Sequence, residues 1–170
     1  GEKHMKTESE INCGKASTGR LKRDILPVIS KRVAAAIDNA LSAELEPLEE
    51  IRLRAGKPLV LQNYYKEWFI GPEGRITANP SGSFIVTQED IKSSLELMCD
   101  SSVYACQEEI RSGYVTIRGG HRVGLSGRTV MEGDTVKNIK DVSGLNIRLS
   151  NQIFGCSAGI IGYLLRNGSD

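Results

Sequence analysis

Apolar residues recur every three or four positions over residues 21–41, which is the period of a helix that buries one face. Pro27 lies within the first turns of this helix, or else it divides a short leading turn from the main helix. A second helix is predicted to begin at Thr87, because Asp90 three positions later resembles the partner of a capping box. The same period predicts a short helix over residues 103–110, stopped at Gly113, and a terminal helix over residues 155–166.

Alternation of apolar and polar residues predicts strands between these helices. The predicted strands are residues 50–54, 59–61, 67–70, 75–77, 114–118, 121–130 and 136–150, the last interrupted near Ser143-Gly144. The first two are expected to form a hairpin, and so are the two that flank Gly119-Gly120. Antiparallel hairpins with segregated helices favour an α+β fold. We expect an antiparallel or mixed sheet with helices mainly on one face, including an N-terminal and a C-terminal helix.

Residues 19–170 are expected to form a single domain, since 39% apolar and 25% charged residues is ordinary soluble globular composition. Residues 1–18 are polar and without an apolar period, so they are predicted to be a disordered tail that begins with a tag remnant at residues 1–4. The longest apolar runs are short, and no segment is predicted to span a membrane.

Charge is unevenly distributed along a chain whose net charge is only +1. Residues 40–110 hold 12 acids and 6 bases, whereas residues 111–148 hold 3 acids and 7 bases. The basic stretch is consistent with a surface that faces an anion, and equally with an uneven scatter of solvated charges.

The chain lacks the sequence motifs that mark several kinds of catalytic or metal site. The four cysteines form no CxxC pair and there are two histidines, so we expect free thiols and no metal site. No GxxxxGK[ST], GxSxG or HExxH motif occurs. His121 falls on the apolar side of its predicted strand and is interpreted as a core histidine. The carboxylates of residues 44–50 are interpreted as solvated, and Trp68 and Phe69 as packing residues.

The glycine- and arginine-rich segment over residues 119–128 is the most informative part of the chain. Strand alternation places Arg122 and Arg128 on one face, about 20 Å apart at ~3.3 Å per residue, with small residues between them. Arg148 on the next predicted strand extends this face, and a guanidinium suits phosphate because it donates two parallel hydrogen bonds. The supporting positions of the motif are Gly119, Gly120, His121, Gly124 and Gly127.

Two other interpretations of this face stay open. It can be the solvated side of an antiparallel sheet, with glycines at bulges and turns. It can also bind single-stranded nucleic acid or another phosphate-bearing ligand, although aromatic residues, on which bases stack, make up only 5% of the chain.

Three segments carry a resemblance to a known family: residues 113–128, residues 49–59, and residues 139–148 with Gly155-Cys156. Together they resemble the N-terminal region of the stage III sporulation protein AA family over residues 21–166. The family is similar to secretion and pilus ATPases of the type II and type IV kind. The P-loop ATPase domain of that family follows a segment like residues 151–166, and this chain lacks it.

The resemblance implies a cytoplasmic mother-cell ATPase, peripheral to the forespore-facing membrane, that energises a channel complex during endospore formation. ATP and magnesium are expected for the full-length protein, and no cofactor or enzymatic activity for this fragment. The expected partners are its own ATPase domain, neighbouring subunits of a hexameric ring and membrane components of the channel, but not nucleic acid. The resemblance assigns Arg122, Arg128 and Arg148 to a surface that faces nucleotide phosphate or a neighbouring subunit. The acidic stretch over residues 40–110 also suits a docking domain for a membrane partner.

Overall fold

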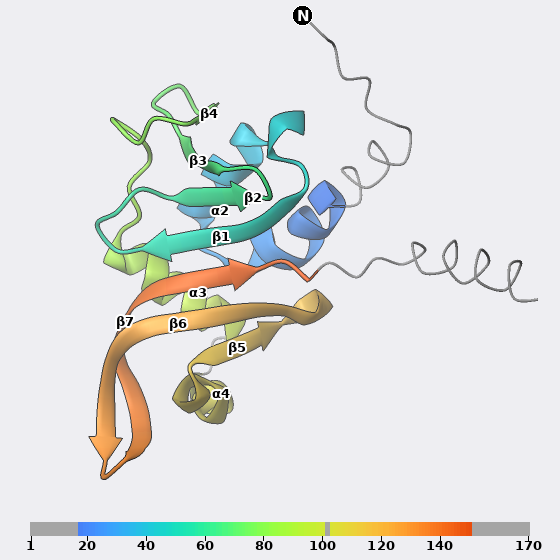
Figure 1. The fold of residues 1–170 in the computed structure, drawn as a ribbon. Coiled ribbons are helices and arrows are strands. Elements are labelled where there is room, and N and C mark those ends of the chain that lie inside the picture. Colours follow the sequence, from blue (N-terminus) through green and yellow to red (C-terminus); the bar gives the residue numbers. More distant parts are fainter. Residues whose placement is uncertain (1–16, 101–102, 151–170) are drawn as a thin grey trace, which may run out of the picture.

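A computed structural model describes residues 17–100 and 103–150 and has one antiparallel sheet with the strand order β4-β3-β2-β1-β7-β6-β5 (Figure 1). The strands are β1 (Leu48–Arg54), β2 (Val60–Asn63), β3 (Glu67–Ile70), β4 (Ile76–Thr77), β5 (Tyr114–Ile117), β6 (His121–Glu132) and β7 (Thr135–Arg148). Every neighbouring pair is antiparallel, and β1 lies beside β7 although most of the chain separates them. The predicted strands and both predicted hairpins are confirmed.

The helices α2 (Lys31–Ala40), α3 (Gln88–Met98) and α4 (Gln107–Ser112) lie together on one side of the sheet (Figure 1). Between helices and sheet is a single apolar core, in which Ile37 of α2, Ile51 of β1 and Ile91 of α3 are fully buried. Burial of this shared apolar surface is the main favourable contribution to folding. The expected α+β fold, with helices mainly on one face, is confirmed.

The first predicted helix is divided, as one of the two interpretations of Pro27 allowed. From the first described residue, Ser17, which lies inside the predicted tail, the backbone is helical and continues through η1 (Leu21–Ile25) and the 3₁₀ turn η2 (Leu26–Val28). Extended backbone at Ile29 then interrupts it, and Ser30 caps α2 by accepting a hydrogen bond from the Val33 amide. The predicted terminal helix over residues 155–166 lies outside the described residues.

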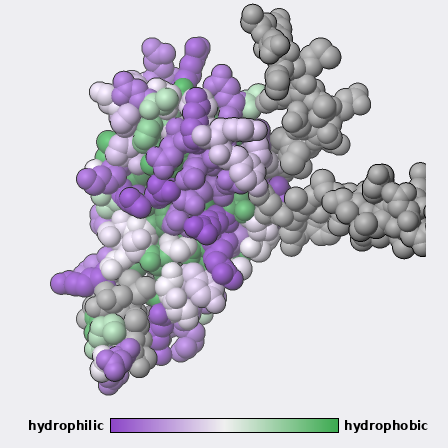
Figure 2. Space-filling view, in the orientation of Figure 1, coloured by the Kyte–Doolittle hydropathy of each residue, from purple (hydrophilic) through white to green (hydrophobic). Residues whose placement is uncertain are grey.

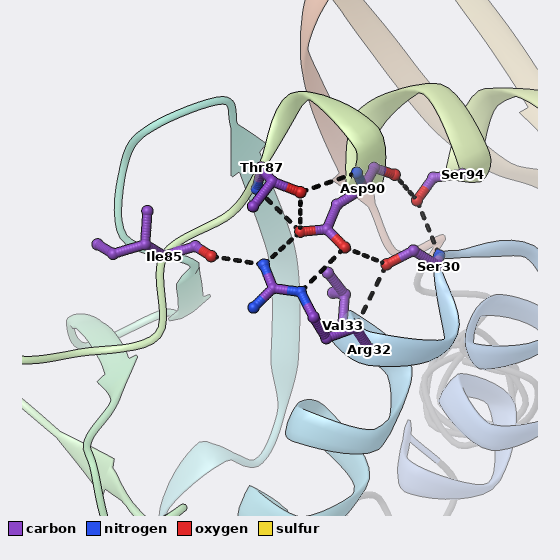
Figure 3. A network of polar contacts seen from close by, with 7 residues as sticks. All are labelled: Ser30, Arg32, Val33, Ile85, Thr87, Asp90 and Ser94. Atoms are coloured by element: carbon purple, nitrogen blue, oxygen red, sulfur yellow. Dashed lines mark hydrogen bonds and ion pairs between the residues drawn. The ribbon is translucent and has the colours of Figure 1, made fainter.

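A buried polar network fastens α2 to α3 (Figure 3). Asp90 completes the predicted capping box with Thr87, and it also accepts hydrogen bonds from the Ser30 hydroxyl at 2.8 Å and the Arg32 guanidinium at 2.5 Å. The Ser94 hydroxyl in turn accepts from the Ser30 amide at 2.9 Å. Because each of these polar groups has a partner, the helix termini can be buried without an unsatisfied charge.

Toward its tip, the β6–β7 hairpin bends away from the rest of the sheet (Figure 1). Its register shifts between Ser126 and Arg128, and the partner strand has Asp141 at a φ of 51° opposite that point. A bulge of this kind bends a strand and increases its twist. The interruption predicted near Ser143-Gly144 is therefore a bulge within a continuous β7.

Candidate basic face of the sheet

One side of the sheet is not covered by any described helix, and we call it the open face. Ile51 and Leu53 of β1 are buried toward the helices, so Arg52 and Arg54 between and after them point to the open face. Figure 2 shows hydrophilic side chains gathered over this side of the molecule. Arg122 of β6 and Arg148 of β7 fall on the same side, because Val123 and Ile147 beside them are buried.

Arg122 and Arg148 are brought together in the centre of this face. They are direct partners across β6 and β7 in the sheet register. The Cβ atoms of such partners lie about 4.5–5.5 Å apart, and like charges at that separation repel. The two side chains therefore begin side by side and bring two positive charges to the centre of this face, where an anion with several oxygens can accept paired hydrogen bonds.

Each of these two arginines has one neighbour that orients it. The Arg122 guanidinium lies over the Tyr114 ring, 4.9 Å from its centroid. The Nε atom of Arg148 lies 3.4 Å from Oε2 of Glu50, whose side chain is 12% exposed. Arg148 itself is 73% exposed, so this ion pair contributes little free energy and leaves its guanidinium accessible. The sequence-based interpretation of Glu50 as solvated is wrong, because its side chain is mostly buried and pairs with Arg148 and Arg52.

Arg128 lies apart from the other two arginines. It follows the bulge at which the hairpin leaves the plane of the sheet, and its guanidinium is 2.5 Å from Oδ2 of Asp141. Both side chains of that pair are mostly exposed. The structure thus places Arg122 and Arg148 in one site and Arg128 on the projecting hairpin.

Three further cations on the open face did not enter the sequence-based site. Arg52 forms ion pairs with Glu50 and Glu67, and Arg54 and Lys57 are exposed at the end of β1 and in the turn that follows. The alternation of Glu50-Ile51-Arg52-Leu53-Arg54 already places the two arginines on one side of a strand. What the sequence did not reveal is that β1 pairs with β7, which puts these arginines on the same face as Arg148.

His121 is a core residue, as predicted, and it joins the two ends of the described domain. Its ring is 1% exposed, and its Nδ1 accepts a hydrogen bond from the Ser150 amide at 2.9 Å. The other ring nitrogen lies 3.4 Å from Oδ2 of the buried Asp24. The Arg23 guanidinium lowers the pKa of Asp24 against the opposing effect of burial, so this carboxylate stays charged.

The glycines of the motif have different roles. Gly119 has a φ of +84°, and a Cβ added there would lie 2.6 Å from Oδ2 of Asp24, so only glycine fits beside the buried carboxylate. Gly120 also has a positive φ but faces open space. Gly124 has ordinary space around it on the open face, and Gly127 lies in the bulge between Ser126 and Arg128.

No metal cluster of three or more His, Cys, Asp or Glu side chains occurs among residues 17–100 and 103–150. Cys99 and Cys106 are free and buried, and the predicted thiols at Cys13 and Cys156 lie outside the described residues. Burial raises the pKa of the Cys99 thiol to about 12, which makes it a poor nucleophile. Across the same described ranges no helix is long and apolar enough to cross a membrane.

Comparisons with known proteins agree on one family. The family model described as sporulation stage III, protein AA, matches residues 19–170. Stage III sporulation protein AA of Bacillus subtilis (strain 168) is 31% identical over 144 residues, which is 85% of this chain and 43% of that relative. The chain thus spans less than half the length of the curated relative it matches. No solved structure matches the chain.

Proposed function

The chain belongs to the stage III sporulation protein AA family, which supports a role in sporulation, and from that premise we propose that it is an assembly and regulatory domain of a secretion-type motor ATPase. In this proposal the longer protein forms a hexameric ring in the mother-cell cytoplasm. The ring energises a channel complex at the forespore-facing membrane. Its N-terminal domain contacts its own ATPase domain, the neighbouring subunits and the membrane components of the channel.

The observation that carries this proposal is the in-register pair of Arg122 and Arg148. Both guanidinium groups lie on the open face and both side chains are exposed. An open sheet face can lie flat against another domain, and a guanidinium fork presented there can stabilise charge on a transferring phosphoryl group in trans. We assign these two arginines to the surface that faces the nucleotide phosphates or the neighbouring subunit, with Arg128 in a lesser role.

ATP and magnesium belong to the longer protein in this proposal. This chain has no GxxxxGK[ST] segment to cradle phosphates, and its described carboxylates form no metal cluster. The residues present therefore do not fit a complete nucleotide site. We propose that the isolated chain hydrolyses no ATP and acts only by placing arginines against a site built by another domain.

A nucleic-acid-binding function has weaker support. Of the aromatic residues on the open face, Phe69 is half-buried and the Tyr114 ring is covered by Arg122. The most exposed tyrosines of the region, Tyr64 and Tyr65, follow β2 in the turn to β3. Because bases need aromatic side chains on which to stack, a basic face with few exposed rings favours phosphate or carboxylate over single-stranded nucleic acid.

ATP turnover by the full-length protein tests the proposal. We expect Arg122→Ala and Arg148→Ala each to lower turnover by about 10³-fold or more, the range of arginine residues that act in trans. Arg122→Lys and Arg148→Lys are expected to recover only part of the activity, because lysine keeps the charge and loses the fork. Arg128→Ala is expected to lower turnover much less, since its guanidinium is already paired with Asp141.

Arg75→Ala is the matched control, because Arg75 is an exposed arginine in the loop between β3 and β4. Its turnover is expected to equal that of the unaltered protein. Unchanged turnover in both the Arg122 and Arg148 alanine variants, in protein that still folds, contradicts the assignment.

A further inference from the structure

The open face also contains a small cavity, which we call the basic hollow, with cations around an apolar base. It is lined by Arg52, Arg54, Lys57, Pro58, Val60 and Phe69. Phe69 and Val60 lie side by side on adjacent strands, because β2 and β3 pair Leu61 with Trp68, which are the next residues along each strand. They supply an apolar base, while the cations come from the end of β1 and the turn after it.

Two of the three cations are available to a ligand. Arg52 is engaged, with its guanidinium donating to Glu50 at 2.8 Å, Glu67 at 3.1 Å and Gln62 at 3.1 Å. Arg54 and Lys57 are exposed and form no ion pair with any described residue. A ligand that brings carboxylates to Arg54 and Lys57 therefore meets no competing acid.

The volume of the hollow, about 220 Å³, limits what enters it. Sites for small molecules typically measure about 300–1,000 Å³. The basic hollow is below that range and has room for one branched aliphatic side chain. Its complement is thus an apolar side chain of a protein, flanked by carboxylates.

A matching surface occurs at the end of α3 of the same chain, and we call it the acidic edge: Glu96, Leu97 and Asp100. Leu97 is 38% exposed, and both acidic residues are exposed. Leu97 lies in the last turn of α3, and Asp100 follows two residues after the helix ends, in the turn where its φ is 50°. No described residue forms an ion pair with either acid.

The hollow and the acidic edge cannot meet within one molecule. The hollow is on the open face, and α3 covers the opposite side of the sheet (Figure 1). We infer that the basic hollow of one copy receives Leu97 of a second copy, with Glu96 and Asp100 against Arg54 and Lys57. Two different surfaces in contact form a head-to-tail interface, which closes into a ring when the rotation between copies permits. This inference rests on the proposed ring and identifies one contact between its N-terminal domains.

Complementary charge reversals test the contact by sedimentation of the 170-residue chain over a range of concentrations. A hollow variant, Arg54→Glu with Lys57→Glu, keeps only the acidic edge. An edge variant, Glu96→Lys with Asp100→Lys, keeps only the hollow. We expect the unaltered chain to self-associate and each variant alone to associate at least tenfold more weakly.

Mixing the two variants is the decisive step. The mixture contains both complementary pairs, the basic hollow with the acidic edge and the reversed hollow with the reversed edge, so we expect the two variants to co-assemble where neither associates alone. A chain with all four reversals is expected to self-associate again, and Leu97→Asp is expected to prevent association. Arg75→Glu with Glu73→Lys, two exposed residues outside both surfaces, is the control and is expected to behave as the unaltered chain.

An unaltered chain that stays monomeric at every concentration overturns the inference. So does a mixture of the two variants that forms no complex while the unaltered chain associates. The outcome is separable from the proposed function, because Arg122 and Arg148 lie outside both surfaces. Loss of turnover in the arginine variants without self-association would leave the proposed function standing and refute only this contact.

Discussion

Gly119 lies against the buried side chains of Asp24 and His121, where two chain segments are in close contact. The two carboxylate oxygens of Asp24 are occupied by Arg23 at 2.8 Å, and one of them also faces the His121 ring. A buried carboxylate is costly unless it is paired and hydrogen-bonded, so this charge depends on the space that Gly119 leaves.

Gly119→Ala is therefore expected to lower the free energy of unfolding by about 3 kcal/mol, near the upper end for ordinary substitutions. Gly120→Ala is the matched control, because its φ of +74° is similar but its Cβ meets nothing within 4 Å. The free energy of unfolding of Gly120→Ala is expected to fall by only about 1 kcal/mol, which is the cost of placing an alanine in the left-handed backbone conformation. Urea unfolding of the two variants makes the comparison, and equal losses would show that the close contact with Asp24 is not what requires glycine.

The burial of a single residue could be predicted where the alternation of apolar and polar positions in a strand decides it. His121 alternates with buried residues of a strand, and its burial follows from that alternation alone. The ion pair between Glu50 and Arg148 could not be predicted, because it joins strands far apart in the sequence whose pairing no local signal records.

Asp90 connects two helices, and its charge makes that connection depend on pH. Burial by itself raises the pKa of Asp90, but hydrogen bonds from Arg32, Thr87 and Ser30 outweigh burial and lower it from 3.8 to about 2. A carboxyl group whose pKa is lower in the folded chain than in the unfolded chain stabilises the fold at pH values above its pKa in the unfolded chain. That stabilisation, about 2 kcal/mol, is lost as the pH falls from about 4 to about 2.

Asp90→Asn is expected to lower the free energy of unfolding at pH 7 by at least about 2 kcal/mol and to remove the Asp90 contribution to acid sensitivity between pH 4 and pH 2. The control is Asp38→Asn, since the pair of Asp38 with Lys22 is about half exposed and contributes little. Urea unfolding at pH 7 and at pH 3 measures both variants. If Asp90→Asn and the unaltered chain lose the same stability between these pH values, the network does not hold a charged carboxylate.

The helices and strands were mostly predictable because their signals are local. The capping box at Thr87 and the αL glycine after α4 mark a helix start and a helix end within a few residues. The division of the first helix was open from the sequence, because Pro27 is tolerated in a first turn or after a break. The displacement of Arg128 by the bulge could not be predicted, since a bulge depends on how two strands pair.

The molecule as a whole presents two unlike sides, one covered by helices and one open and basic. This arrangement follows from the sheet order, in which β7 lies between β1 and β6 and unites cations from separate parts of the chain. Sequence alternation assigned Arg122 and Arg148 correctly to one surface. It missed Arg54 and Lys57, because the pairing of β1 with β7 is a property of the folded chain.

A double-mutant cycle on ATP turnover by the full-length protein tests most directly whether Arg122 and Arg148 act as one site. Two groups that bind the same anion are not additive, because loss of either already disables the site. We expect the double variant Arg122→Ala with Arg148→Ala to turn over ATP within about threefold of the slower single variant. A double variant whose loss equals the product of the two single losses, or single variants with unchanged turnover, would contradict the account.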